Sequence, residues 1–521
     1  MDVKSRFKEA AAVWFTSYLF FLFFLVSNFS AAHDSINYLN NISRGEHLFH
    51  QHHLLYHFLA RQWLVLWKSI LPAVPEHFLI ESFTAVWGSA ILSVSYLFLR
   101  VRFGLRPLAA IGGVMTIGFS FGVWFYSTNI EVYTPPAFFI IWCLYLISAE
   151  KLSVGIGWLV GVLNSMAVLF HQVNVLFAVV MIICLYARRG SIPAGRVFIQ
   201  YAFTSILLAG GTYFLIGWFV ERHNSLSAWI TWMEGYTVGH GYWQPLSLAT
   251  PFHVITGFAH AFVGGHFVFR LPAVETWLKT SFESHGLADE VYLASGISHT
   301  MAWLLTILSL LLALIMGLML FRLLINWKIL IGKAAYIFQP LLACLFVYSL
   351  FFCFWMPEIL EFWIIQMILV WLILAGSLAF ITTPWKGGAT GALLLTAVLL
   401  FTINFFGSMT WLGKQGFDLY FKKVEPLSRV VRQGDLVLVE DGWILRDFMV
   451  RYLDAPVISS GDPDYSATST ADKIEQTLAG KGRVYVYPGT EKPGTPVIEK
   501  LLKNYDGRKI RKDGDLFYVI E

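Results

Sequence analysis

Charged residues are scarce in this chain of 521 residues, because Asp, Glu, Lys and Arg make up only 13% of it while 57% of the residues are hydrophobic. Soluble domains carry about twice this share of charge. The composition therefore excludes a series of soluble domains and predicts an integral membrane protein. The scarcity is uneven, since 34 of the 70 charged residues lie between Lys414 and Glu521. We expect a transmembrane domain over residues 1–411 and a water-exposed domain over residues 412–521.

Cysteine and dense basic clusters are also lacking. The four cysteines, Cys143, Cys184, Cys344 and Cys353, all lie inside apolar runs, which excludes a disulfide framework and a CxxC metal clamp. The formal net charge is +4, without the concentrated positive charge that nucleic-acid binding requires. Nucleic acid is therefore not an expected partner.

Long apolar runs are what the sequence does have, and a membrane span needs about 20 such residues. The first run follows Lys4, Arg6 and Lys8 and is long enough to be an uncleaved first helix. The pattern predicts a mainly α, polytopic membrane protein of about eleven transmembrane helices, at residues 13–32, 78–99, 108–126, 133–149, 154–170, 173–187, 198–220, 301–321, 336–355, 362–382 and 389–411.

Basic residues set the expected orientation. With a cytoplasmic N-terminus, every inner connection carries Lys or Arg, from Arg100 to Lys386. All 15 histidines then fall on the outer side, as do Asp34, Glu131, Glu358 and Glu361. Ionisable groups gathered at one face of a membrane protein indicate a site. We therefore expect outward-facing chemistry, with a multi-pass protein in a bacterial inner membrane.

Two apolar segments do not fit this count of spans. A span at residues 251–269 would move the basic loop around Lys328 to the outer side, so we predict a re-entrant or interfacial segment there. In the outer loop 33–77, the run 54–71 carries a polar stripe that predicts an interfacial amphipathic helix. The stripe consists of His50, His53, His57, Arg61 and Lys68.

The hydrophilic tail has the pattern of a small extracytoplasmic α/β domain. Apolar clusters at residues 436–439, 484–487 and 516–520 predict buried strands, and the stretches 443–453, 470–478 and 496–502 predict helices. The tail has no GxGxxG, P-loop or HExxH sequence. We expect it to be a cap or recognition module.

Polar motifs lie in the first three expected outer loops of the chain. Asp34-Ser35 comes directly after the first run, Gly45-Glu46-His47 begins a segment that ends at Tyr56, and Glu131-Val132-Tyr133 stands before the fourth run. His171 lies between two short apolar runs, 154–170 and 173–187. In this order the motifs resemble the GT-C superfamily of membrane glycosyltransferases, and are most similar to its protein O-mannosyltransferase-like branch. His33 stands where that branch has Gly, and His50-Gln51-His52-His53 replaces its Pro-Pro-Gly segment.

The resemblance implies transfer of a hexose or pentose, with inversion, from a polyprenyl-phosphate sugar to a hydroxyl of a protein, lipid or glycan acceptor. It implies that Asp34 takes the hydroxyl proton and that Glu131 positions the acceptor or assists Asp34, since such a transfer needs a carboxylate base. Donor phosphate is expected to bind one of four cations, Arg61, Arg222, Arg270 or Lys279. Further substrate contacts are expected from His33, His53, Tyr56, Tyr133 and His171, and from Glu358 and Glu361, which we place on one helical face.

Two other functions remain open from the sequence. Five histidines from His47 to His57 are typical of a divalent-metal site, with His50, His53 and His57 as ligands, in a transferase or a metal transporter. Few polar residues lie deep in the apolar runs, which favours an outward-facing enzyme over a transporter. A non-catalytic polyprenyl-lipid flippase or scaffold would differ only in having no need of Asp34 and Glu131.

Overall fold

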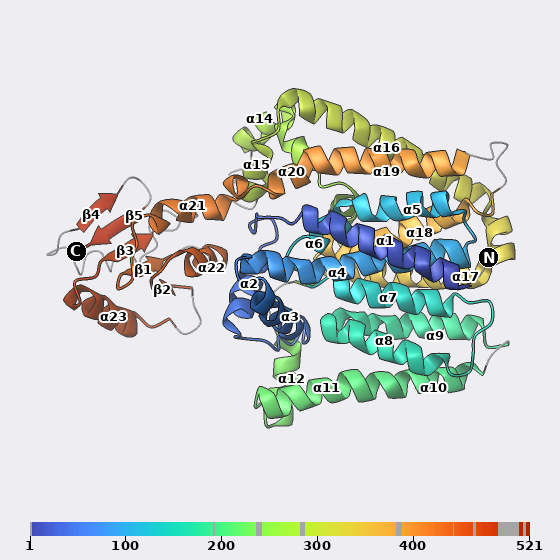
Figure 1. Cartoon of the computed structure of the whole chain (residues 1–521), viewed down its shortest axis with the longest axis horizontal. Helices are drawn as coiled ribbons and strands as arrows, with labels where there is room; N and C mark the ends of the chain where they lie inside the picture. The colour runs from blue at the N-terminus through green and yellow to red at the C-terminus, as the bar shows by residue number, and fades with distance from the viewer. Residues whose placement is uncertain are drawn as a thin grey trace. The chain divides into compact units, whose positions relative to one another are not determined.

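The computed structural model describes residues 3–190, 193–235, 242–281, 287–381, 388–440, 442–461, 465–487, 510–513 and 517–521 (Figure 1). The chain forms two compact units. The first comprises Met1–Val26, Asn41–Leu271 and Ile297–Thr410, and the second comprises Ser27–Asn40, Pro272–Gly296 and Trp411–Glu521. One unit boundary, between Thr410 and Trp411, lies next to the predicted division at residue 411, and the assignment of a transmembrane and a water-exposed domain stays a prediction. The prediction did not anticipate that two outer loops join the C-terminal residues.

The first unit is a bundle of helices that run roughly side by side (Figure 1). Its helices are α1 (Val3–Phe23), α3 (Tyr56–Ile70), α4 (Glu76–Leu97), α5 (Pro107–Phe119), α6 (Phe121–Ser127), α7 (Thr134–Ile147), α8 (Ile156–Phe170), α9 (Phe177–Ala187), α10 (Ala194–Ser205), α11 (Gly211–Leu215), α12 (Leu226–Glu234), α13 (Thr250–Phe262), α16 (His299–Ile325), α17 (Trp327–Phe352), α18 (Ile364–Ser377) and α19 (Gly388–Asn404). Helices α2 (Asp34–Arg44) and α20 (Thr410–Leu412) have residues in both units.

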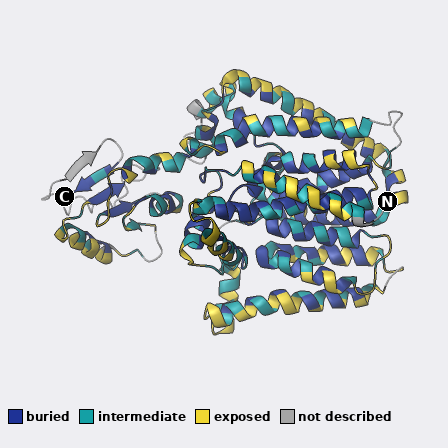
Figure 2. Cartoon of the chain, viewed as in Figure 1, coloured by how far each residue is buried: buried dark blue, intermediate teal, exposed yellow. Residues whose placement is uncertain are grey.

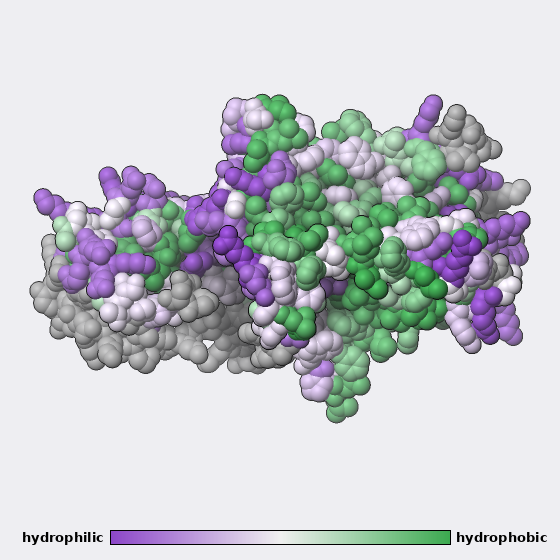
Figure 3. All heavy atoms as spheres, turned by 90° about the horizontal axis from the view of Figure 1, so that it is seen from below, coloured by the Kyte–Doolittle hydropathy of each residue, from purple (hydrophilic) through white to green (hydrophobic). Residues whose placement is uncertain are grey.

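Apolar surface covers much of this bundle. Six helices of the described chain are long and apolar enough to cross a membrane, or seven if α5 and α6, bent by 70° at Ser120, form one span. Helix α4 is largely buried, whereas α10 and α16 expose many apolar side chains (Figure 2). Hydrophobic residues also cover much of the bundle on the face seen in Figure 3. Such exposure suits contact with lipid. The chain is thus a polytopic membrane protein, and the number of eleven spans stays a prediction.

The first predicted span is wrong at its end, because α1 stops at Phe23 and not at Ala32. Polar residues explain the early stop. Within the second unit, the amide of Asn28 donates to the carbonyl oxygen of Phe417 at 2.9 Å, and the hydroxyl of Ser30 bonds the Asp418 carboxylate. Residues 27–30 make these contacts in a non-helical conformation, so α1 does not continue through them.

Basic residues from separate inner connections meet at one end of the bundle. Arg100 pairs with Glu9 at 3.2 Å, and Arg102 donates to the carbonyl oxygen of Tyr145 at 2.9 Å. Arg188 donates to the carbonyl oxygens of Ala149 and Tyr336, both at 2.7 Å. The loops that the sequence assigned to one side of the membrane therefore do lie together.

The segment predicted to be re-entrant contains a helix of 13 residues, α13, which spans about 20 Å and is shorter than a bilayer core. The turn after it is held by Asn404, whose oxygen accepts from the backbone amide of Gly264 at 3.0 Å and whose amide donates to Phe262 and Phe119 carbonyl oxygens at 2.9 and 2.7 Å. The 3₁₀ turn His266–Arg270 follows. A re-entrant or interfacial placement stays a prediction.

The predicted amphipathic helix is present as α3, but its polar stripe is not continuous. His50 and His53 precede the helix, which begins at Tyr56, so only His57, Arg61 and Lys68 belong to it. His57 is buried, and the exposed face carries the apolar residues Val65, Leu66 and Ile70. The face of α3 that contains His57 therefore packs against the rest of the protein, although the spacing of polar residues predicted that this face would be exposed.

The second unit contains a five-stranded sheet in the order β2-β1-β3-β5-β4. Its strands are β1 (Leu436–Val439), β2 (Val457–Ser459), β3 (Val484–Tyr487), β4 (Ile510–Asp513) and β5 (Phe517–Ile520), and its helices include α14 (Pro272–Ser281), α15 (Ala288–Ala294), α21 (Leu419–Ser428), α22 (Trp443–Tyr452) and α23 (Ala467–Ala479). Strand β1 runs parallel to β2 and β3, and β5 runs antiparallel to β3 and β4.

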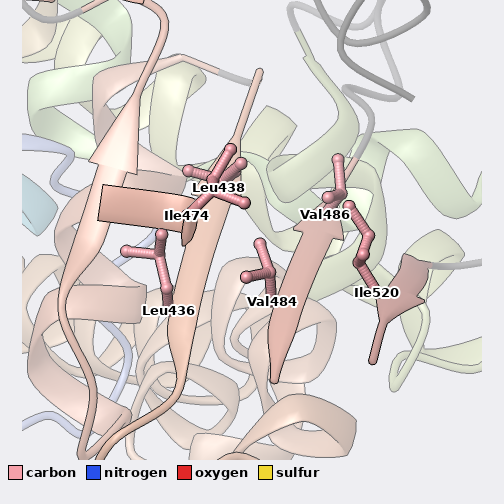
Figure 4. Close-up of a cluster of buried hydrophobic side chains, with 6 residues drawn as sticks. All are labelled: Leu436, Leu438, Ile474, Val484, Val486 and Ile520. Atoms are coloured by element: carbon pink, nitrogen blue, oxygen red, sulfur yellow. The ribbon is translucent and has the colours of Figure 1, made fainter. Parts of the chain in front are cut away.

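A buried cluster shows why the tail forms this sheet. Leu436 and Leu438 of β1, Val484 and Val486 of β3, and Ile520 of β5 pack with Ile474 of α23 (Figure 4). The three predicted strands and the helices at 443–453 and 470–478 are confirmed. The helix predicted at 496–502 lies outside the described residues. The sequence missed β2, which has three residues, and β4, which has the polar sequence Ile-Arg-Lys-Asp.

Candidate functional site

The predicted site residues belong to both units: His33, Asp34 and Lys279 to the second, and the others to the first. Asp34 is the first residue of α2, where the helix dipole favours a negative charge. Its side chain is exposed and accepts a hydrogen bond from the hydroxyl of Tyr38, one turn later, at 3.1 Å. An exposed, oriented carboxylate can accept a proton from a bound molecule.

His33 makes a contact that sequence inspection did not predict. Its Nε2 lies 3.1 Å from an oxygen of Asp289 at the start of α15, and the two side chains are 47% and 12% exposed. The protein around the ring opposes protonation, but the bond to Asp289 and the charges of Asp289, Asp34 and Glu290 raise the pKa of His33. No sequence signal links positions 33 and 289, which are 256 residues apart.

Helix α2 is anchored within the second unit by two asparagines. Asn37 donates to the Asp447 carboxylate at 2.8 Å, and Asn40 donates to the backbone carbonyl oxygen of Asp447 at 2.9 Å. Asp447 also pairs with Arg446 at 3.0 Å. Side-chain bonds of this kind fix the rotation of α2 about its axis, and with it the direction in which Asp34 points.

In the first unit, Glu131 lies in the connection between α6 and α7. The sequence predicts an exposed connection, but Glu131 is only 2% exposed and its neighbours Asn129 and Ile130 are fully buried. The prediction of an exposed connection is wrong, because neighbouring parts of the protein pack over these residues and exclude solvent. Burial, and further the charges of Glu131 and Glu81, raise the pKa of Tyr56. Tyr56 is hydrogen-bonded to Thr84 at 2.8 Å.

Glu361 is held by two tyrosines, Tyr133 of the predicted motif and Tyr126, which the sequence did not single out. Tyr126 donates to one carboxylate oxygen at 2.8 Å, and Tyr133 donates to the other. The ring of His171 lies against Tyr133, with centroids 5.3 Å apart. Tyr133, His171 and Glu361 are therefore neighbours, although they are far apart in the sequence.

Glu358 and Glu361 do not share a helical face, which corrects the sequence prediction. Glu358 precedes the short 3₁₀ helix Leu360–Trp363 that contains Glu361. It accepts from the amide of Gln244 at 3.1 and 3.2 Å and lies 3.9 Å from His253. Ile359, which lies between the two acids, has an extended backbone with φ of −85° and ψ of 118°, so no continuous helix joins them.

The histidine cluster is packed but is not arranged as a metal site. His50 and His53 stack at 4.1 Å with 9° between their ring planes. Because imidazole lone pairs lie in the ring plane, parallel stacked rings do not converge on one ion. No group of three His, Cys, Asp or Glu side chains among the described residues could hold a metal. Burial, and further the neighbouring imidazoles, lower the pKa of His50 to about 3.

Other histidines of this region serve as local contacts. His57 bonds the backbone carbonyl oxygen of His47 at 3.1 Å, and His52 bonds the side chain of Gln172 at 3.0 Å. Burial lowers the pKa of His57 to about 4 and that of His171 to about 3. The rings of His57 and His171 are therefore neutral at physiological pH.

The predicted phosphate-binding cations differ in their surroundings. Arg61 donates to the carbonyl oxygens of Ile42 and Ser43 at 3.1 and 2.7 Å, and Arg270 donates to that of Ile297 at 3.0 Å. Arg222 has a left-handed backbone with φ of 60°. The side chain of Lys279 lies outside the described part of the chain.

No family model and no curated protein matches this sequence. Solved structures do match. ArnT from Cupriavidus metallidurans bound to undecaprenyl phosphate aligns at 11% identity over 99% of this chain and 97% of its own, with a TM-score of 0.57. The same protein in the apo state aligns at 13% identity over the same shares, with a TM-score of 0.51.

A yeast protein O-mannosyltransferase complex, Pmt1-Pmt2, aligns at 15% identity over 47% of this chain and 36% of its own, with a TM-score of 0.33. The protein O-mannosyltransferase-like branch stays a prediction. The ArnT alignments cover the helical bundle and the C-terminal residues together. This chain therefore has the fold of the GT-C membrane glycosyltransferases.

Proposed function

We propose that the protein transfers a sugar from a polyprenyl-phosphate donor to an acceptor hydroxyl on the extracytoplasmic side of a bacterial inner membrane. The observation that carries this proposal is the end-to-end similarity to ArnT, which binds undecaprenyl phosphate. Fold similarity alone does not determine chemistry. The proposal therefore also rests on the exposed, oriented carboxylate of Asp34.

In the proposed reaction, Asp34 accepts the proton of the acceptor hydroxyl as its oxygen bonds the anomeric carbon of the sugar. The bond from that carbon to the phosphate oxygen breaks, and its electron pair leaves with polyprenyl phosphate. One displacement of this kind inverts the anomeric configuration. We propose that Glu131, Tyr133, His171 and Glu361 contact the substrates and that Arg61 or Arg270 contacts the donor phosphate.

The test adds purified protein to membranes that supply native donors and acceptors, and follows polyprenyl-phosphate sugars and glycosylated products by mass spectrometry. Wild type is expected to consume a donor, and Asp34→Asn is expected to lose at least a hundredfold in rate, as removal of a general base does. Asp472→Asn is the matched control, because Asp472 is an exposed acid on α23 of the same unit. Its rate should equal that of wild type.

Each contrary outcome has a distinct meaning. Consumption at an equal rate by Asp34→Asn would reject Asp34 as the base. Donor translocation without product would favour a flippase or scaffold. No consumption by wild type under conditions where a known transferase acts would reject glycosyl transfer.

A further inference from the structure

His33 and Asp289 form a pair at the start of α2, directly beside the residue proposed as the base. The pair joins a loop that precedes α2 to α15, with Nε2 of His33 3.1 Å from the Asp289 carboxylate. The His33 ring also lies edge-on to Tyr420 of α21, at 6.5 Å between centroids. Three elements of the second unit therefore define the position of this ring.

The charges around His33 are mostly negative, and Asp34 depends on that ring: burial raises the pKa of Asp34, whereas the bond from Tyr38 and the charge of His33 lower it. Asp289 and Glu290 of α15 both interact with His33, and burial together with the charge of Asp289 raises the pKa of Glu290 to about 7. On α21, Lys423 lies over the Tyr420 ring at 4.9 Å, and on α2 the hydroxyl of Tyr38 donates to Asp34. A second carboxylate charge in such a setting is disfavoured unless a cation lies near it.

We propose, on the basis of the proposed function, that His33 is a positioning residue whose positive charge, oriented by Asp289, keeps Asp34 ionised and ready to accept the hydroxyl proton. His33 sits next to Asp34 in the chain, and the bond to Asp289 ties up one ring nitrogen and stabilises the imidazolium form. The charge of His33 is not consumed in the reaction, because the proton moves from the acceptor to Asp34 and then to solvent.

This role differs from a merely structural tie between α15 and α2 in its dependence on pH. A neighbouring cation lowers the pH at which a carboxylate becomes protonated by about one unit at a partly exposed position. Removal of the cation should therefore move the acidic limb of the rate profile to higher pH. Loss of a structural tie would lower the rate by the same factor at every pH.

The experiment measures kcat and KM for sugar transfer between pH 5 and pH 9 in wild type, His33→Gln, His33→Lys and Tyr292→Phe. Tyr292→Phe is the matched control, since it removes another tie of α15, the bond from Tyr292 to the carbonyl oxygen of Gly416 at 3.2 Å, without a change of charge. We expect His33→Gln to shift the acidic limb of kcat upward by about one pH unit, with little change in KM. His33→Lys should restore the wild-type limb, and Tyr292→Phe should not move it.

A uniform loss in His33→Gln, or an equal shift in Tyr292→Phe, would overturn the proposal. A second measurement needs no turnover: a carbodiimide modifies protonated carboxyl groups, and peptide mass spectrometry reports its reaction with the exposed Asp34. At pH 6, His33→Gln should be modified several-fold faster at Asp34 than wild type or His33→Lys. If wild type transfers no sugar but this difference is found, the proposed function fails while the electrostatic role of His33 stands. Equal modification rates would refute that role.

Discussion

The two hydrogen bonds to Glu361 predict a strong energetic coupling in the first unit. Tyr126 is 3% exposed and donates to the carboxylate at 2.8 Å, and a hydrogen bond to a charged group contributes about 1.5 to 3 kcal/mol. The carboxylate also accepts from Tyr133. Because Glu361 is partly exposed, we expect a coupling of about 1 to 2 kcal/mol between Tyr126 and Glu361.

A double-mutant cycle measures this coupling. The free energy of unfolding would be determined for wild type, Tyr126→Phe, Glu361→Gln and the double variant by titration with sodium dodecyl sulfate in mixed micelles. The matched control is the cycle of Gln244→Ala with Glu358→Gln, whose bonds are 3.1 and 3.2 Å long and whose acid is 38% exposed. We expect at most about 0.5 kcal/mol for the control.

Additive effects of Tyr126→Phe and Glu361→Gln would refute this reasoning, because they would show that the contact contributes no more than its two separate side chains. A coupling in the control as large as that in the Glu361 cycle would also refute it. In that case, burial would not govern the strength of carboxylate hydrogen bonds at this end of the bundle.

Three further predictions concern buried positions. Burial raises the pKa of Asp418 from 3.8 to about 6. The stabilisation from its protonated form is therefore complete below about pH 4 and lost as pH rises through 6, by up to about 3 kcal/mol. The free energy of unfolding of wild type and Asp418→Asn, measured from pH 4 to 7, checks this. An equally steep pH dependence in both proteins would contradict it. Glu81 is fully buried in α4, and neither carboxyl oxygen has a hydrogen-bond partner among the described residues. Glu81→Gln should therefore raise the free energy of unfolding by about 1 kcal/mol. A lower free energy of unfolding would show that Glu81 has a partner that the described residues do not reveal. An added Cβ at Gly88 would overlap the Ser127 side chain, so Gly88→Ala should lower the free energy of unfolding by about 1 to 3 kcal/mol. Gly317 has open space around it, so Gly317→Ala should not. Equal melting temperatures of the two variants would contradict the close packing at Gly88.

Much of the fold follows from local sequence. Apolar runs from 78–99 to 389–411 each contain a helix, because an apolar segment in lipid must satisfy its backbone hydrogen bonds internally. Strands β1, β3 and β5 were predicted from apolar clusters that become the sheet core. Strand β4 was missed because its polar edge sequence carries no such signal.

The site was predicted less completely. Motif order identified Asp34, Glu131, Tyr133 and His171 as candidates, and the tyrosine contact with Glu361 brings three of the predicted residues together. Histidine spacing suggested a metal site, but stacking of His50 on His53 depends on how the chain turns before α3. Spacing along a helix cannot predict ring orientation in a segment that is not helical.

By itself, the sequence determined that this protein crosses a membrane, which apolar runs contain helices, where three of its strands lie, and which carboxylates stand between the apolar runs, since these depend on composition and short-range pattern. Only the tertiary structure decided that Glu131 is buried, that Asp418 bonds residues near the start of the chain, and that His33 meets Asp289. Partners separated by more than 200 residues are chosen by the packing of whole elements, and no local pattern in the sequence specifies them.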